Sequence, residues 1–91
     1  MNFEWDENKR LSNLEKHGID FTDAVAVFQD KNRISTIDKR YEYGEIRIKT
    51  IGKIQQGLIA AIIHTDRNNT TRLISARSAN KIEREQYYGN R

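Results

Sequence analysis

The sequence has no cysteine and no proline among its 91 residues. Without cysteine, disulfide bridges and thiolate metal ligands are excluded, which fits a reducing cytoplasm. Without proline the usual marker of a domain boundary is missing, and no linker, repeat or low-complexity segment interrupts the chain. A chain this short can build only one hydrophobic core, so we expect a single domain over residues 1–91.

Long apolar runs are also absent. The longest is "LIAAII", residues 58–63, far short of the roughly 20 residues that a membrane-spanning helix needs. The polar N-terminus does not have the pattern of a signal peptide. The mean hydropathy is −0.86, yet 36% of the residues are hydrophobic, which argues against disorder. We therefore expect a soluble, cytoplasmic protein.

Metal ligands are scarce. His17 and His64 are the only histidines, they lie in different predicted elements, and no carboxylates pair at ligand spacing within one element. This pattern gives little support to a metal site. An enzyme with this sequence is expected to work without a metal or another cofactor.

Acidic and basic side chains are concentrated in different parts of the chain. Residues 1–30 carry three basic and seven acidic side chains, net −4, and residues 31–91 carry thirteen basic and six acidic, net +7. The split indicates one basic surface, which in a small domain points first to a polyanionic partner such as RNA. A mixed, solvated surface is the alternative.

The hydrophobic pattern changes from helical to strand-like near residue 33. It predicts strands at 3–5, 33–38, 45–54, 58–65 and 70–77, and helices at 7–17, from 21 to about 28, and at 81–88. The order is β-α-α-β-β-β-β-α, with hairpin-length connections between the later strands. We expect an α+β fold with an antiparallel sheet and helices packed mainly on one face.

The first helix is predicted to carry Leu11 and Leu14, which are three residues apart, on one face and to end at "KHG". Lys16 and His17 suit the negative end of a helix, and Gly18 suits a left-handed cap, so these residues fit a plain helix stop. The alternative is that Lys16 or His17 also contacts a phosphate.

The strand at 45–54 alternates between two kinds of side chain. Arg47, Lys49 and Lys53 share one face, and Ile46, Ile48 and Ile54 share the other. Residues two apart, such as Arg47 and Lys49, are about 7 Å apart along a strand, roughly the separation of successive nucleotide phosphates. Phosphate contact and a solvated sheet face are both compatible with this pattern.

Two arginines of the last strand, Arg72 and Arg77, are five residues apart. Without a bulge they point to opposite faces, and Arg77 is the better candidate to share the face of Arg47 because it lies where the strand meets the helix. The alternative role for Arg77 is an ion pair with Glu83 or Glu85.

Three further side chains are candidates for chemistry. His64 ends an apolar strand, where a histidine is more often a hydrogen-bonded part of the core than an acid or base. Tyr87 and Tyr88 can stack on a base or pack in the core.

Several stretches occur together in an order that resembles a known family. They are "FEWDENK", "NLEKHGIDFTDA", "VF" with Asp30 after it, Asp38 followed by "YGEIR", Gly52, "HTDR", and "RLISARSA" with Glu83 and Tyr87 beyond. This series resembles the BrnT toxins of BrnT/BrnA toxin–antitoxin modules over essentially the whole chain.

The resemblance implies a RelE-like fold and a ribonuclease that arrests translation. It also implies a BrnA-like antitoxin that neutralises the toxin in a heteromeric complex, often a dimer of heterodimers, and that alone contacts DNA. The positions that match recurring motifs are Lys16, His17, Glu45, Arg47, Arg72, Arg77 and Tyr87.

Metal-free RNA cleavage needs a base, an acid and cations at the phosphate. Arg47 and Arg77 suit the phosphate, with Lys49 adding to the field, while Glu45 or His64 is the candidate base. A histidine or a tyrosine is the candidate acid. Two alternatives remain: a non-catalytic RNA-binding module that uses the same basic face, and an interaction domain for an acidic protein.

Overall fold

The computed structural model describes residues 1–39 and 44–89, without the side chain of Gln56. Its elements are β1 (Asn2–Trp5), α1 (Glu7–His17), α2 (Phe21–Ala24), the 3-10 helix η1 (Val25–Gln29), β2 (Ile34–Asp38), β3 (Arg47–Lys53), the 3-10 helix η2 (Gln55–Gly57), β4 (Ile59–Arg67), β5 (Thr70–Ser78) and α3 (Lys81–Gly89). With α2 and η1 as one helical segment, the expected order β-α-α-β-β-β-β-α is confirmed. The hairpin-length connection expected between the strands at 33–38 and 45–54 falls largely outside the described residues.

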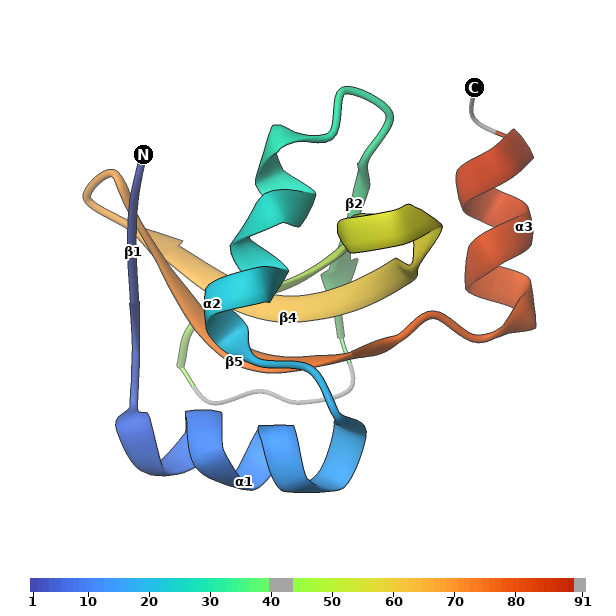
Figure 1. Cartoon of the computed structure of the whole chain (residues 1–91). Coiled ribbons are helices and arrows are strands. Elements are labelled where there is room, and N and C mark those ends of the chain that lie inside the picture. Colours follow the sequence, from blue (N-terminus) through green and yellow to red (C-terminus); the bar gives the residue numbers. More distant parts are fainter. Residues whose placement is uncertain (40–43, 90–91) are drawn as a thin grey trace.

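The five strands form one mixed sheet in the order β1-β5-β4-β3-β2. The strands from β2 to β5 are antiparallel to their neighbours, as expected. The first strand differs, because β1 pairs in parallel with β5. Figure 1 shows β1 and α3 at opposite sides of the molecule, with α1 along one edge of the sheet.

The ends of α1 follow from local chemistry. The Asp6 side chain accepts hydrogen bonds from the backbone N–H groups of Asn8 and Lys9, which have no partner within the helix. Gly18 adopts a left-handed conformation with φ 73°, and its N–H donates to the carbonyl of Leu14 at 2.8 Å. The predicted helix stop at "KHG" is therefore confirmed.

The face of α1 that carries Leu11 and Leu14 is not buried. Leu11 is 52% exposed and Leu14 38% exposed, whereas Asn13 is buried. The Asn13 amide donates to the carbonyls of Ala76 and Ile19, and its oxygen accepts from the Ala76 N–H. The register of β1 with β5 ends at Leu73, so Asn13 pairs with the β5 backbone beyond the end of β1. α1 thus attaches to the sheet edge by hydrogen bonds.

The core has two parts, one on each face of the sheet. The larger cluster consists of Ile19, Phe21, Ala24, Val27, Ala60, Ile62, Leu73 and Ala76. The smaller cluster lies under α3 and consists of Ile51, Ile59, Ala61, Ala79 and Tyr87. α2 and η1 therefore cover one face, and α3 covers part of the other.

A bulge in β5 changes the direction of its side chains. Ile63 pairs with Ser75 but the next residue, His64, pairs with Leu73, so Ile74 is the extra residue. The extra residue shifts the alternation of side chains along β5 by one, so Arg72 lies on the same face as Arg77. The expectation that these two arginines point to opposite faces is therefore wrong.

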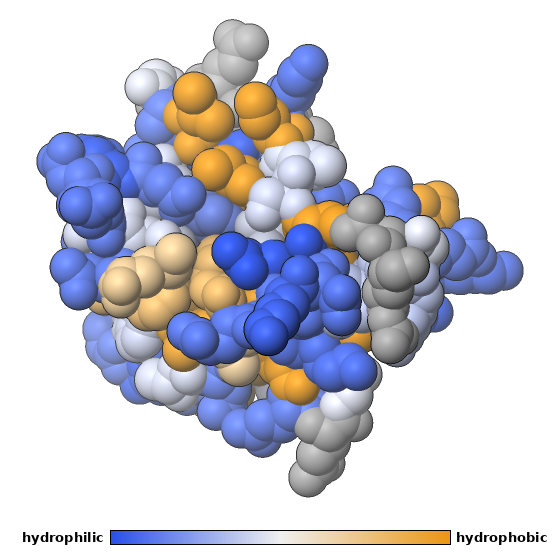
Figure 2. Space-filling view, turned by 90° about the horizontal axis from the view of Figure 1, so that it is seen from above, coloured by the Kyte–Doolittle hydropathy of each residue, from blue (hydrophilic) through white to orange (hydrophobic). Residues whose placement is uncertain are grey.

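The face seen in Figure 2 is mainly hydrophilic, with separate groups of apolar side chains. Exposed apolar residues include Ile37, Ile46, Leu58 and Ile82. Among the residues that the structure describes, no helix combines the length and the apolar character needed to cross a membrane.

Candidate functional site

The cations of β3 and β5 lie on one face of the sheet, which we call the basic face and define by Arg47, Lys49, Lys53, Arg72 and Arg77. Lys49 pairs with Ile63, which pairs with Ser75, so these three side chains lie on the same face of the sheet. Ile51, Ala61 and Arg77 are paired in the same way and lie on that face too. α3 packs on the same face over Ile51, so this helix covers part of the basic face.

Glu45 joins two arginines at the open end of the basic face. Its Oε1 lies 3.9 Å from Arg47 Nε, and its Oε2 lies 3.5 Å from Arg67 Nη2. The carboxylate is 31% exposed. Arg67, at the end of β4, belongs to the quoted "HTDR" stretch, but was not among the predicted site residues.

A groove adjoins this cluster on the basic face. It is lined by Glu4, Thr65, Arg67, Asn68, Thr70 and Arg72. Arg72 donates to Glu4 at 2.9 Å across the parallel pair of β5 and β1. Arg67 belongs both to the groove and to the Glu45 cluster, so the predicted residues Glu45, Arg47 and Arg72 surround one part of the surface.

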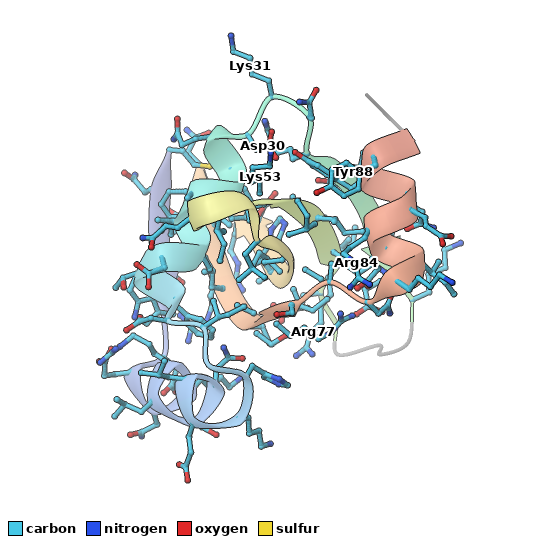
Figure 3. All side chains as sticks on the ribbon, turned by 45° about the vertical axis from the view of Figure 1, so that its right-hand side comes forward. Asp30, Lys31, Lys53, Arg77, Arg84 and Tyr88 are labelled. Atoms are coloured by element: carbon cyan, nitrogen blue, oxygen red, sulfur yellow. The ribbon has the colours of Figure 1, made fainter. Side chains whose placement is uncertain are left out.

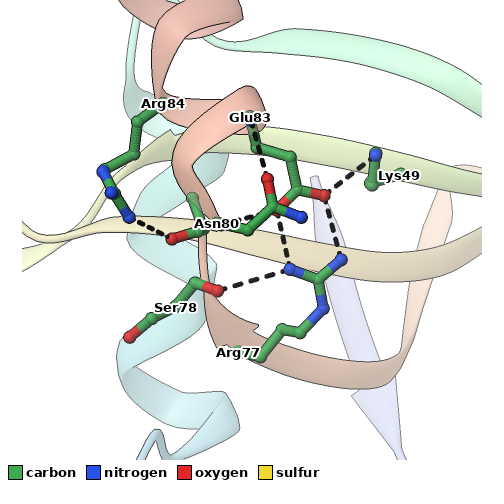
Figure 4. A network of polar contacts seen from close by, with 7 residues as sticks. Lys49, Arg77, Ser78, Asn80, Glu83 and Arg84 are labelled. Atoms are coloured by element: carbon green, nitrogen blue, oxygen red, sulfur yellow. Dashed lines mark hydrogen bonds and ion pairs between the residues drawn. The ribbon is translucent and has the colours of Figure 1, made fainter.

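Arg77 and Lys49 meet at Glu83 under the first turn of α3 (Figure 4). Arg77 donates to both Glu83 oxygens at 2.7 and 2.9 Å, and Lys49 Nζ donates to Oε2 at 2.9 Å. Hydrogen bonds, first from Arg77 and then from Asn80 and Lys49, hold the pKa of Glu83 at about 2 although burial opposes this shift. The ion pair foreseen as the alternative for Arg77 is present.

The start of α3 has a capping box, which the spacing of Asn80 and Glu83 in the sequence predicts. The Asn80 side chain accepts from the Glu83 N–H at 2.9 Å, and Glu83 Oε1 accepts from the Asn80 N–H at the same distance. Glu83 therefore ties the helix start to the sheet as well as to the cations.

His64 lies on the opposite face and is 3% exposed. Its Nδ1 is 2.8 Å from Asp66 Oδ1, its Nε2 is 2.7 Å from Thr50 Oγ1, and its ring meets the ring of Phe28 edge-on. Burial lowers the pKa of His64, and Asp66 only partly opposes this. His64 is a hydrogen-bonded part of the core and does not reach the basic face.

Tyr87 is likewise placed in the core. It is 1% exposed, and its hydroxyl donates to Asp30 at 2.6 Å. The same carboxylate accepts from the Lys53 N–H, and Asp30 and Lys53 lie together in Figure 3. Burial alone would raise the pKa of Asp30, but these hydrogen bonds bring it below its usual value. Tyr87 thus links α3 to the end of η1.

Lys16 and His17 lie in a shallow pocket between α1 and the β5 bulge. Its lining includes both residues, Lys9, Ile74 and Ser75. Ser75 belongs to the same cross-strand row as Lys49. The pocket therefore borders the basic face at the free edge of β5.

A metal site finds no support in residues 1–39 and 44–89. No group of three or more His, Cys, Asp or Glu side chains there is suited to hold a metal ion.

Comparison with known proteins gives the family. Residues 5–83 match the family described as "Ribonuclease toxin, BrnT, of type II toxin-antitoxin system". The crystal structure of the Brucella abortus ribonuclease toxin, BrnT, is 30% identical to this chain, with a TM-score of 0.67; the alignment covers 89% of this chain and 99% of the Brucella chain. A comparison with curated proteins gives no match. The chain belongs to the BrnT family, the ribonuclease toxins of type II toxin–antitoxin systems.

Proposed function

We propose that this toxin is a metal-independent endoribonuclease that cleaves RNA on the basic face and thereby inhibits translation. The observation that carries the proposal is the meeting of an accessible carboxylate, Glu45, with Arg47 and Arg67 beside an open groove. This arrangement supplies a proton acceptor and fixed positive charge at one place, which are the requirements of metal-free phosphodiester cleavage.

Glu45 is the proposed general base. It removes the proton from a ribose 2′-hydroxyl, and the oxygen then attacks the adjacent phosphorus. Arg47 and Arg67 stabilise the negative charge that develops on the phosphoryl oxygens, since guanidinium groups stay protonated at any working pH. The bond to the 5′-oxygen breaks, leaving a 2′,3′-cyclic phosphate and a 5′-hydroxyl.

His17 is the proposed acid that protonates the leaving 5′-oxygen. His64 and Tyr87 are buried, whereas His17 and Tyr88 are exposed. Of these two, His17 is the one that lines the pocket at the β5 edge of the basic face. Replacing His17 by Asn should lower the cleavage rate on the order of 10²- to 10⁴-fold, and a wild-type rate in the folded variant would exclude this role.

The other cations of the basic face bind neighbouring phosphates in this proposal. Lys49 lies two residues beyond Arg47 on β3, about 7 Å along the strand. Arg72 lies in the groove itself, and Lys16 lines the pocket beside Ser75 of β5. These positions suit a single RNA strand that crosses the sheet beside α3.

The antitoxin is proposed to be BrnA-like and to cover the basic face with acidic groups. Charge complementarity favours this surface, because residues 31–91 carry thirteen basic and six acidic side chains, net +7. The complex is proposed to be a dimer of heterodimers that contacts DNA through the antitoxin alone. An antitoxin bound elsewhere, with the basic face open and the complex inactive, would contradict this arrangement.

The test is cleavage of purified bulk RNA in excess EDTA. Glu45→Gln keeps the shape of the side chain but cannot act as a base, so the rate should fall on the order of 10²- to 10⁴-fold. Arg67→Ala removes a side chain that is 70% exposed, so it should lower the rate with little effect on folding. Mass spectrometry of the products should find the cyclic phosphate.

Lys31→Ala is the matched control, because it removes one positive charge from a side chain that points into solvent away from Arg77 (Figure 3). It should cut RNA at the wild-type rate, with circular dichroism confirming the fold of each variant. A folded Glu45→Gln variant with wild-type activity would exclude Glu45 as the base. A folded wild type that binds RNA in a salt-dependent way without cutting it would favour the non-catalytic RNA-binding module.

A further inference from the structure

Glu83 is a buried carboxylate of α3 that binds two cations of the basic face at once. Its side chain is 4% exposed. Its Oε1 accepts from Arg77 and from the Asn80 N–H, and its Oε2 accepts from Arg77 and Lys49, all between 2.7 and 2.9 Å. A carboxylate has about four lone-pair sites, so these contacts use its whole acceptor capacity.

The network of Arg77, Lys49 and Glu83 carries a net charge of about +1, since Glu83 is ionised at neutral pH. The cationic side chains remain partly accessible, at 29% for Arg77 and 26% for Lys49. One phosphodiester, with a single negative charge, would balance the network.

We propose that Glu83 is a positioning residue of the ribonuclease, which holds Arg77 and Lys49 in one geometry so that a phosphate of the bound RNA meets two fixed positive charges. A lysine side chain is a flexible four-carbon chain, and a fixed donor needs no reorganisation when charge develops on the substrate. The inference rests on the proposed function, because it assumes that the basic face binds RNA.

The alternative role for Glu83 is to mask the two cations, and it predicts the opposite change in RNA affinity when the charge is removed. If Glu83 occupied the place of a phosphate and masked the cations, removing its charge would tighten RNA binding. If Glu83 positions the cations, removing its charge releases them, and binding does not tighten although the local charge rises by one.

The experiment uses Glu83→Gln in the whole chain. Glutamine can still accept from the Asn80 N–H, but its amide places donors against Arg77 and Lys49. We expect kcat for RNA cleavage to fall by about tenfold or more, up to the roughly 10²- to 10³-fold typical of a lost transition-state donor, while KM changes little. A fully 2′-O-methylated RNA cannot be cut, so it reports binding alone. It should bind to Glu83→Gln no more tightly than to the wild type.

Two variants separate positioning from loss of stability. Asn80→Ala removes the side-chain bond to the Glu83 N–H and weakens the helix cap without changing any charge. Its kcat per folded molecule should stay at the wild-type value even though its melting temperature falls. Glu83→Asp restores the charge with a shorter reach, so its kcat should lie between those of Glu83→Gln and the wild type.

The results distinguish this inference from the proposed function. Wild-type kcat in folded Glu83→Gln, or tighter binding of the methylated RNA, would overturn the positioning role. If the wild type cuts no RNA, the proposed function fails. The binding comparison then decides alone: tighter binding by Glu83→Gln refutes the positioning role, and equal or weaker binding supports it.

Discussion

Single buried polar side chains connect distant parts of this molecule. Asn13 joins α1 to β5, Tyr87 joins α3 to Asp30, and Glu83 joins α3 to β3 and β5. Each bond replaces water at a buried polar group, so losing one partner leaves the other without compensation. Residues of this kind fix where the exposed site residues lie.

Asn13→Ala should destabilise the protein by roughly 2–4 kcal/mol, because it leaves the Ala76 N–H and two carbonyls without their partner. Urea denaturation at neutral pH would measure this change. Leu11→Ala, on the same helix but 52% exposed, should cost about 0.5 kcal/mol or less. Similar losses for the two variants would contradict the role given to Asn13.

The roles of individual residues were only partly predictable from the sequence. The spacing of Asn80 and Glu83 predicted a capping box, and alternation in β3 predicted that Arg47 and Lys49 share a face. The positions of Arg72 and Asn13 were not predictable, because a bulge and a hydrogen bond to a distant strand leave no periodic signal. His64 and Tyr87 are candidate acids or bases by residue type, and only their burial assigns them to the core.

At the scale of elements, close contact between η1 and β3 depends on Gly52. A Cβ added at Gly52 would lie 2.9 Å from Val27 Cγ1 and 3.3 Å from the Val27 carbonyl oxygen. Val27 is fully buried in the larger core cluster, so it has little room to move. The glycine therefore sets how closely the helical segment approaches the sheet.

Gly52→Ala should destabilise the protein by about 1–3 kcal/mol through overpacking. Adding Val27→Ala should recover part of the loss, because it removes the side-chain atom nearest to the new methyl group. The test is a double-mutant cycle in urea, with Val27→Ala alone as the reference. Additive losses would show that the two positions do not compete for the same space.

The elements themselves were largely predictable, since caps at Asp6 and Asp20 and the strand alternation have local causes. The parallel pairing of β1 was not, because a short strand carries no signal for its neighbour. The exposure of Leu11 and Leu14 was not predictable, because helical spacing indicates which side chains share a face and not whether that face is buried.

For the whole molecule, acid should reduce stability in two steps. Burial lowers the pKa of His64 below its ordinary 6.5, so the unfolded chain takes up this proton first as the pH falls through 6.5. The pKa of Glu83 is about 2 in the folded state against an ordinary 4.5. Its stabilisation is therefore present above pH 4.5 and lost between 4.5 and 2, and amounts to about 3 kcal/mol.

Urea denaturation between pH 7 and pH 3 would test this expectation. Glu83→Gln should be less stable than the wild type at pH 7, and the difference should narrow as the pH falls below 4.5. A constant difference over that range would mean that the ionisation of Glu83 does not contribute to folding.

The parallel pairing of β1 with β5 has a consequence for the synthesis of this toxin. β1 is synthesised before β5, so Glu4 can pair with Arg72 only after a further 68 residues have been made. Arg77 and Glu83 come later still, so the basic face cannot be completed before α3 has left the ribosome. The order of the strands thus delays assembly of this nuclease until β5 and α3 have been translated.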